Sequence, residues 1–303
     1  MSVQDWDLRH YRLLHALAAQ GSIGGAARAT GVAQPNASRM LEQMERSAGF
    51  PLAHRTARGT GLSDQGRVLA GLAAEVLEAN DHVLRAVEAL RSGSAGTLHV
   101  CASMTVAEHL MPLWLASAQQ RMPHTKVALD VGNSDAVFER LASGAAELGF
   151  VEGPTVRTGF RYLDAARDEL AVVVPIGHAW AKRGKEVPAA EVAAAGLVVR
   201  EPGSGTRQTA DLALDPYGAG PRYEVGSNAA LVASVAAGLG PGVVSRLAVE
   251  HLLRTGSLVE VDVEGLRLGR TLRAVWPAGT TLGKGAAEFL ALALEAPHPY
   301  RMK

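Results

Sequence analysis

The sequence predicts an α/β protein that begins with an all-α-type helix-turn-helix. Three observations support this prediction: short helical segments separated by glycines near the N-terminus, one long helix with a heptad pattern, and an alternation of β-branched runs with helical stretches in the rest of the chain. With 303 residues the chain is too long for one simple core, so two or three domains are expected.

The composition is that of a globular protein, with 48% hydrophobic and 20% charged residues. No apolar run reaches the roughly 18 residues of a membrane helix, and residues 1–10 lack the pattern of a secretory signal. We therefore expect a cytoplasmic protein. Cys101 is the single cysteine, which excludes an intrachain disulfide and a multi-cysteine zinc site, and its apolar surroundings argue against a redox role. No cofactor and no metal are expected.

Three helices are predicted in the N-terminal segment, and each is followed by a glycine that suits a helix end: Gly21, Gly31 and Gly49. Ser22 caps the second helix, and the third starts near Gln34 with Pro35 in its first turn. Two helices joined by a short turn form the arrangement in which the second enters the major groove of DNA. Its outward face carries the polar residues Asn36, Arg39 and Gln43.

A β-wing is predicted over residues 52–62, which are polar and rich in Arg, Thr and Gly. Arg55 and Arg58 are expected to contact phosphate there, with a solvated loop as the alternative. The chain has a net charge of zero, but between Gly21 and Arg67 the arginines outnumber the acidic residues six to three, and no lysine occurs before Lys126. Arginine suits phosphate and guanine edges, although GC-rich codon usage would also favour it.

A long helix is predicted over residues 63–92, with an apolar seam at heptad spacing. The seam favours dimerisation over packing on the chain's own core, because the helix lies between a DNA-binding unit and the Gly/Ser stretch at residues 92–94. The a positions are Leu69, Val76, Val83 and Leu90, and the d positions are Leu72, Ala79 and Ala86.

The remaining chain is expected to alternate strands and helices, with strands at residues 97–102, 127–132, 148–152, 170–175, 197–200 and 242–245. The histidines are scattered, and Ser204 lacks the Gly-x-Ser-x-Gly pattern of a hydrolase nucleophile. The sequence therefore does not predict an enzyme.

Motifs along nearly the whole chain resemble those of the LysR-type transcriptional regulators. In the N-terminal region they include Gln34-Pro35, Ser38-Arg39, Met44-Glu45, Pro51-Leu52, Arg58-Gly59, Leu62-Ser63 and Gly66. In the C-terminal region they are Ser103-Met104-Thr105, Leu110-Met111-Pro112 and residues 200–207 and 236–240.

This resemblance implies a winged helix-turn-helix DNA-binding domain at residues 1–62, a dimerisation linker helix at 63–92 and an effector-binding domain at 93–303. The effector-binding domain would have two Rossmann-like subdomains of the periplasmic-binding-protein type, about 97–165 with 268–296 and about 166–267, joined by two crossover strands. The implied protein is a sequence-specific DNA-binding transcription regulator that senses a small metabolite in the cleft. It would be a homodimer or homotetramer on an operator with two half-sites.

By the same resemblance, Gln34, Ser38 and Arg39 are candidates for DNA contact, with Asn36 at a base edge and Arg55 and Arg58 on the backbone. Thr30 stands where the family has Leu, and Ala53 stands where it has Phe. Gly24-Gly25 lowers the helix propensity of the second helix. Phe50 is one candidate to fill the space beside Ala53, and ordering by DNA and dimer contacts is the other explanation.

Two loops are candidates for the effector site, because each follows a predicted strand and starts a helix, where the helix dipole favours an anionic group. Simple capping is the alternative, and neutral polar ligands use the same donors. The candidate residues are Ser103, Thr105, Arg200, Gly203, Ser204, Gly205, Thr206 and Asn228. The competing function is a small-molecule-binding protein or enzyme that uses residues 203–206 for phosphate.

Overall fold

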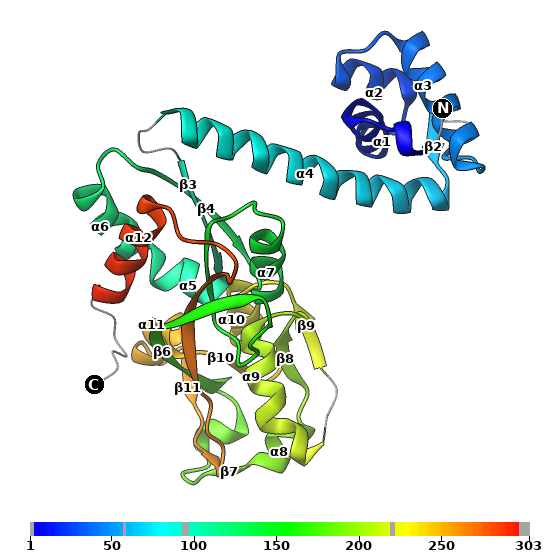
Figure 1. Ribbon diagram of the computed structural model, residues 1–303. Helices are drawn as coiled ribbons and strands as arrows, with labels where there is room; N and C mark the ends of the chain where they lie inside the picture. Colours follow the sequence, from blue (N-terminus) through cyan, green and yellow to red (C-terminus); the bar gives the residue numbers. More distant parts are fainter. Residues whose placement is uncertain (1–2, 57–58, 93–96, 219–221, 297–303) are drawn as a thin grey trace. The chain divides into compact units, whose positions relative to one another are not determined.

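The structure is a computed structural model that describes residues 3–56, 59–92, 97–218 and 222–296. The chain divides into two compact units, Met1–Arg91 and Ser92–Lys303 (Figure 1), and each has its own hydrophobic core. Within the described ranges, no helix combines the length and the apolar character needed to cross a membrane.

The N-terminal unit consists of helices and one hairpin. Its elements are η1 (Val3–Asp5), α1 (Leu8–Gln20), α2 (Ile23–Thr30), α3 (Gln34–Ala48), β1 (Ala53–Thr56), β2 (Gly59–Leu62) and α4 (Asp64–Ser92). The capping predictions are confirmed: Ser22 Oγ accepts from Gly25 N, and Gly21, Gly31 and Gly49 end their helices in the left-handed conformation. The predicted wing is the antiparallel hairpin β1–β2.

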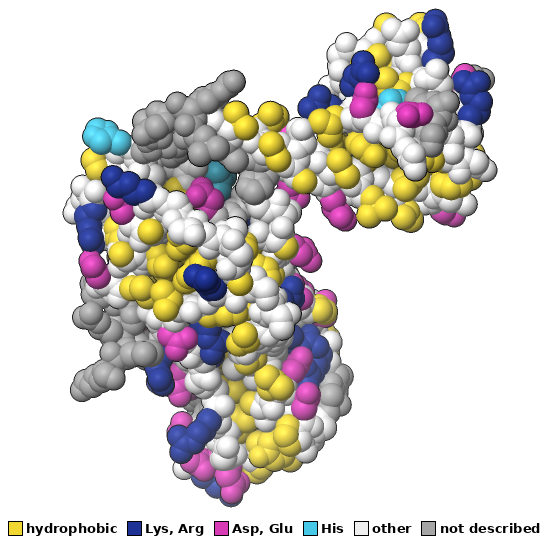
Figure 2. Space-filling view, viewed as in Figure 1, with side chains coloured by type: hydrophobic (Ala, Val, Ile, Leu, Met, Phe, Trp, Pro, Cys, Tyr) yellow, Lys and Arg dark blue, Asp and Glu magenta, His cyan; other side chains and the backbone are white. Residues whose placement is uncertain are grey.

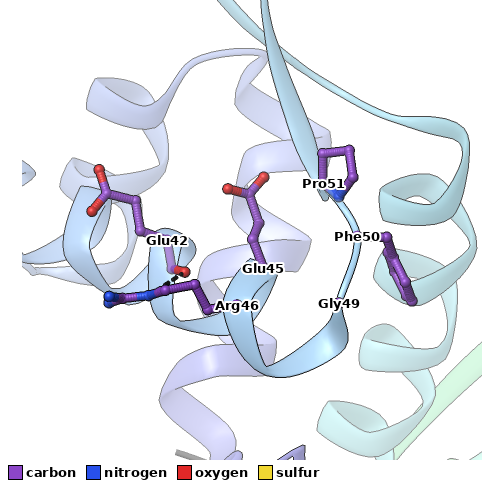
Figure 3. Close-up of a pocket in the computed structure, with 6 residues that line it drawn as sticks. All are labelled: Glu42, Glu45, Arg46, Gly49, Phe50 and Pro51. Carbon is purple, nitrogen blue, oxygen red and sulfur yellow. Dashed lines mark hydrogen bonds between the residues drawn. The ribbon is translucent and has the colours of Figure 1, made fainter.

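The core of this unit joins one face of each helix, with Leu14, Ala26 and Met44 fully buried. Ala53 lies at the edge of this core. Phe50 is 37% exposed and is not among the side chains that pack against this core. Figure 3 shows its ring directed away from Glu45, on the other side of the turn at Gly49. The hydroxyl of Thr30 donates to the carbonyl of Ala26 at 2.8 Å, so this polar residue has a partner in the helix.

The turn between α3 and β1 is fixed by Glu45, whose Oε1 accepts hydrogen bonds from the backbone N–H groups of Leu52 and Ala53 at 2.8 and 3.0 Å. The surface hollow beside it, about 500 Å³ in volume, is therefore lined by a carboxylate that already has partners (Figure 3). Gly66, in the first turn of α4, lies against the same segment: a Cβ there would be 2.0 Å from Leu52 O. Only glycine leaves room for this contact.

Helix α4 is buried at its start and exposed along its apolar seam. Ala70 and Ala73 belong to the core, whereas Leu72 is 50% exposed, Val76 40% and Val83 60%. Figure 2 shows hydrophobic side chains gathered along this helix. The side chains of Ala86 and Leu90, at the predicted end of the seam, lie outside the described part of the structure.

The C-terminal unit is built on one sheet with the strand order β4-β3-β5-β13-β6-β10-β8-β9, and β11 also pairs with β6. A separate small ladder joins β7 (Val187–Pro188) and β12 (Val263–Glu264). The sheet strands are β3 (Thr97–Ser103), β4 (Lys126–Gly132), β5 (Leu148–Val151), β6 (Phe160–Pro175), β8 (Leu197–Arg200), β9 (Arg222–Val225), β10 (Gly242–Ser245), β11 (Leu258–Glu260) and β13 (Gly269–Pro277).

Two subdomains form at the two ends of this sheet. In subdomain I, β3 runs parallel to β4 and β5, and the core lies under α5 (Met104–His109), α6 (Met111–Arg121), α7 (Ser134–Ala142) and α12 (Lys284–Glu295). In subdomain II, β8 runs parallel to β9 and β10, and the helices are α8 (Ala189–Ala194), α9 (Gly205–Leu214), α10 (Asn228–Ala236) and α11 (Arg246–Arg254). Short 3-10 helices, η2 (Ala179–Lys182) and η3 (Asp215–Tyr217), complete the unit. The predicted α/β fold class is confirmed.

Strand β6 continues from one subdomain into the other. Its first part pairs antiparallel with β13 and its last part with β10 and β11. The apolar pattern predicted only residues 170–175 of it and did not locate β13, although the family resemblance implied two crossover strands between the subdomains. Charged residues interrupt the apolar pattern in both strands. In the structure several of them face each other across the ladder, as Asp168 faces Arg270.

Candidate DNA interface and effector site

The polar face of α3 is exposed. Gln34, Asn36, Arg39 and Gln43 are exposed and Ser38 is half-buried, whereas Ala37, Leu41 and Met44 on the opposite face are buried. Within the described part of the chain, no hydrogen bond or ion pair engages the side chains of Asn36, Arg39 and Gln43. An amide, a guanidinium and a second amide at helical spacing can donate to and accept from base edges in a major groove.

The side chains of the two predicted wing arginines lie outside the described part of the structure. Arg58 lies outside the described residues, and only the backbone of Arg55 is described, in β1. Basic side chains are visible on the surface of the N-terminal unit in Figure 2. Of the candidate DNA-contact residues, the structure therefore places those of α3 on one exposed surface.

In the C-terminal unit, residues predicted for effector binding meet between the two subdomains around the buried carboxylate of Glu152, which follows β5. Glu152 Oε2 accepts two hydrogen bonds, one from the hydroxyl of Ser103 at 3.2 Å and one from the backbone N–H of Thr105 at 3.0 Å. The hydroxyl of Thr206, in the first turn of α9, donates to Oε1 at 3.2 Å. We call Ser103, Thr105, Glu152, Thr206 and Arg270 the inter-subdomain site.

Arg270, in β13, contributes the positive charge of this site. Its Nε donates to Asp168 Oδ2 at 2.7 Å, and its two terminal nitrogens donate to the hydroxyls of Thr206 and Thr105 at 3.0 and 3.1 Å. Arg270 Nη1 lies 3.6 Å from Glu152 Oε1. The side chains of Arg270 and Glu152 are 2% exposed and that of Asp168 is fully buried, so one arginine faces two carboxylates away from water.

Arg200, at the end of β8, is fully engaged by neighbouring side chains. It donates to both carboxylate oxygens of Glu201 at 2.8 and 2.9 Å and to Asn228 Oδ1 at 2.6 Å. Burial raises the pKa of Glu201, but the bonds from Arg200 outweigh it and hold this pKa below its ordinary value. Asn228 in turn donates to Thr105 Oγ1 at 3.4 Å, which links Arg200 to the inter-subdomain site.

The loop at residues 203–206 has several roles. Ser204 caps α9 through Arg207 N, as the capping alternative predicted, whereas Ser103 caps no helix and binds Glu152 instead. Gly203 O accepts from Asp135 N at 3.2 Å. A Cβ added at Gly205 would lie 2.6 Å from Gly153 N, so glycine is needed where α9 meets the end of β5.

Sequence reasoning missed Glu152, Asp168 and Arg270. For Glu152 the available signal was a charge at the end of an apolar strand, because buried charges occur where they are paired, whereas Asp168 and Arg270 lie in strands that carry several charged residues. Their partners are distant in the sequence, so the pattern alone could not show which charges meet. Cys101 is buried in β3, and desolvation raises the pKa of its thiol to about 12, which makes the thiolate scarce.

A helix-turn-helix with an exposed recognition face and a two-subdomain α/β unit with convergent polar groups define a DNA-binding regulator with an effector-binding domain. The comparisons agree with this class. Residues 8–67 match the bacterial regulatory helix-turn-helix protein model of the lysR family, and residues 91–297 match the LysR substrate binding domain. The chain belongs to the LysR family of transcriptional regulators.

Relatives and solved structures span most of the chain. An uncharacterized HTH-type transcriptional regulator of Mycobacterium tuberculosis is 42% identical over 287 residues, covering 91% of this chain and 92% of that protein. The regulator CbbR of Xanthobacter flavus is 29% identical, covering 89% and 82%. Full-length CbnR complexed with its target DNA matches with a TM-score of 0.69 at 21% identity, covering 95% and 99%, which shows the shared fold.

The regulatory domain of Synechocystis CcmR in complex with 2-PG matches the C-terminal unit in fold. Its TM-score is 0.60 at 24% identity, and the match covers 66% of this chain and 96% of that domain. The protein is thus a LysR-type DNA-binding transcription regulator with an effector-binding domain.

Proposed function

We propose that the protein binds an operator with two half-sites by placing α3 of two protomers in successive major grooves. The observation that carries this proposal is the exposed polar face of α3, with Asn36, Arg39 and Gln43 outside and the apolar residues buried. In this proposal Gln34 and Ser38 also contact DNA, and Arg55 and Arg58 hold the backbone. The protein acts in the cytoplasm, where its operator is.

We propose that α4 is the dimerisation helix and that effector-binding domains pair dimers into a homotetramer. The exposed seam residues Leu72, Val76 and Val83 support the first step, because an apolar row at heptad spacing is stabilised by a partner helix. The functional division is then residues 1–62 for DNA, 63–92 for dimerisation and 93–303 for the effector.

We propose that the effector is a small anionic metabolite bound at the inter-subdomain site. The hydroxyls of Ser103 and Thr206, the N–H of Thr105 and the guanidinium of Arg270 form a set of donors suited to a carboxylate or phosphate. The CcmR regulatory domain, which has the same fold, is solved in complex with 2-PG.

We propose no enzymatic role for the loop at residues 203–206. Ser204 caps α9 and Thr206 binds Glu152 and Arg270, so both hydroxyls of the loop have partners within the chain. The relatives named above are transcriptional regulators.

A footprint and a mobility-shift titration of the full chain on its own promoter region test the DNA-binding proposal. We expect two protected half-sites with centres one or more helical turns apart, and an affinity that falls steeply with salt. Equal affinity for the promoter fragment and for random DNA of the same length would contradict it.

A further inference from the structure

The donors of the inter-subdomain site already hold an anion, and that anion belongs to the chain. Ser103 and Thr105 N–H bind one oxygen of the Glu152 carboxylate, and Thr206 binds the other, with Arg270 Nη1 at 3.6 Å. Both carboxylate oxygens of Glu152 therefore have hydrogen-bond donors, as the oxygens of a bound carboxylate ligand would. The Glu152 carboxylate stands where the effector anion is proposed to bind.

Glu152 also joins the two subdomains as a ligand between them would. Ser103 and Thr105 belong to subdomain I, whereas Thr206 belongs to α9 of subdomain II. The backbone next to Glu152 lies directly against α9, because a Cβ at Gly205 would be 2.6 Å from Gly153 N. One side chain thus makes bonds on both sides of the site.

The charges of the site leave no place for a second anion beside Glu152. Arg270 is the one cation among three buried charged groups, and Asp168 already takes its Nε and one terminal nitrogen. Arg200, the next cation, is engaged by Glu201 and Asn228. A further carboxylate or phosphate would add like charge in a region away from water, where repulsion is strong.

We propose that Glu152 is an internal ligand of the effector site, and that a carboxylate- or phosphate-bearing effector binds there by displacing the Glu152 carboxylate. This inference rests on the proposed effector site. It makes Glu152 the residue that determines specificity, because an effector must compete with a carboxylate attached to the chain. A ligand without an anionic group gains nothing from this exchange.

Acetate and sulfate are suitable probes, and Glu152→Ala is the first variant. Removing the carboxylate opens the position and leaves its donors on Ser103, Thr105 and Thr206 without an acceptor, while Arg270 keeps Asp168 as its partner, so acetate should bind in its place. We expect calorimetric titration of the full chain to show saturable acetate binding to Glu152→Ala, tighter than to the wild type by about tenfold or more. Glu152→Gln keeps the volume but not the charge and should bind acetate with intermediate affinity.

The controls separate this site from general salt effects. Chloride replaces acetate at equal ionic strength, and Glu139→Ala removes an exposed glutamate of α7 in the same subdomain. Thr206→Val in the Glu152→Ala background removes one donor and should reduce the gain in acetate affinity. An unchanged gain would place the acetate elsewhere and overturn the inference.

Equal acetate affinity in the wild type and in Glu152→Ala would overturn the inference as well. If Glu152→Ala does not fold, the acetate affinity of Glu152→Gln is compared with that of the wild type instead. Equal affinities would again overturn the inference. Saturable binding of methylammonium by the wild type that is lost in Glu152→Gln would identify Glu152 as a direct effector contact and refute displacement. Promoter binding is measured on the wild type without acetate, so a failure of the proposed DNA function is recorded separately.

Discussion

The hydroxyl of Thr206 donates a hydrogen bond to the Glu152 carboxylate at 3.2 Å and accepts one from Arg270 at 3.0 Å. Thr206 belongs to subdomain II, and Glu152 follows a strand of subdomain I, 54 positions earlier in the chain. This contact ties the two subdomains through a buried ionic network, so changes in the network should affect both stability and effector binding.

Arg270→Ala should lower the free energy of unfolding by about 3 to 5 kcal/mol, because it leaves Asp168 and Glu152 buried without their cation. Urea unfolding followed by circular dichroism measures the loss. Arg273→Ala is the matched control on the same strand: its ion-pair partner Asp164 is about half exposed and its other hydrogen bond, to Gly153 O, is 3.3 Å long, so the loss should be about 1 kcal/mol or less. Similar losses for the two variants would show that the buried network is not stabilising.

Arg39→Ala should reduce sequence discrimination by about 1 to 3 kcal/mol at one base pair, because the exposed guanidinium of Arg39 is suited to a guanine edge. Mobility-shift titrations on the promoter and on variants of each half-site measure this. Arg28→Ala, on α2 in the same unit, is the control and should leave the preference between sites unchanged. An equal loss of affinity on promoter and random DNA would mean that Arg39 contacts only the backbone.

Val76→Asp with Val83→Asp should shift the protein to smaller assemblies and weaken promoter binding, since like charges would meet at two a positions of the seam. Light scattering measures the mass of the assembly. Leu84→Asp is the control, because Leu84 on α4 is about as exposed as Val83 but lies outside the a and d positions. An unchanged mass in the double variant would show that the seam is assigned wrongly.

Gly66→Ala and Gly71→Ala should act in opposite directions, although both lie in α4. The added Cβ at position 66 would overlap Leu52 O, so we expect a loss of about 1 to 3 kcal/mol. At position 71 a Cβ meets nothing within 4 Å, and the higher helix propensity of Ala should add about 0.5 to 1 kcal/mol. Thermal unfolding of the two variants compares them. Stabilisation by Gly66→Ala would contradict the observed close approach.

Cys101 should resist thiol reagents in the folded protein, because these reagents attack the thiolate and the pKa of this thiol is raised to about 12 by burial. At pH 8 we expect labelling by iodoacetamide to be about 100-fold slower or more than in urea, where the thiol regains its ordinary pKa. Mass spectrometry of timed samples measures the two rates. Equal rates would mean that the thiol is accessible and ionised in the native protein.

The sequence alone determined the parts of this protein that depend on local signals. Helix periodicity, Ser22 as a cap, the glycines after α1, α2 and α3 and the heptads of α4 act within a few turns, so their positions follow from neighbouring residues. The loops at Ser103 and Thr206 were also found, because each follows an apolar strand and starts a helix. The apolar pattern did not locate β13 or the first part of β6, because charged residues interrupt both strands.

The tertiary structure decided which charges meet. Arg270 and Asp168 face each other only because β6 and β13 pair in one register, and Glu152 reaches Thr206 only because glycines allow α9 to approach β5 closely. Register and close approach are properties of elements far apart in the sequence, so no local pattern encodes them. The same physical reason explains why the sequence indicated the loops at Ser103 and Thr206 but not the Glu152 carboxylate that both of them bind.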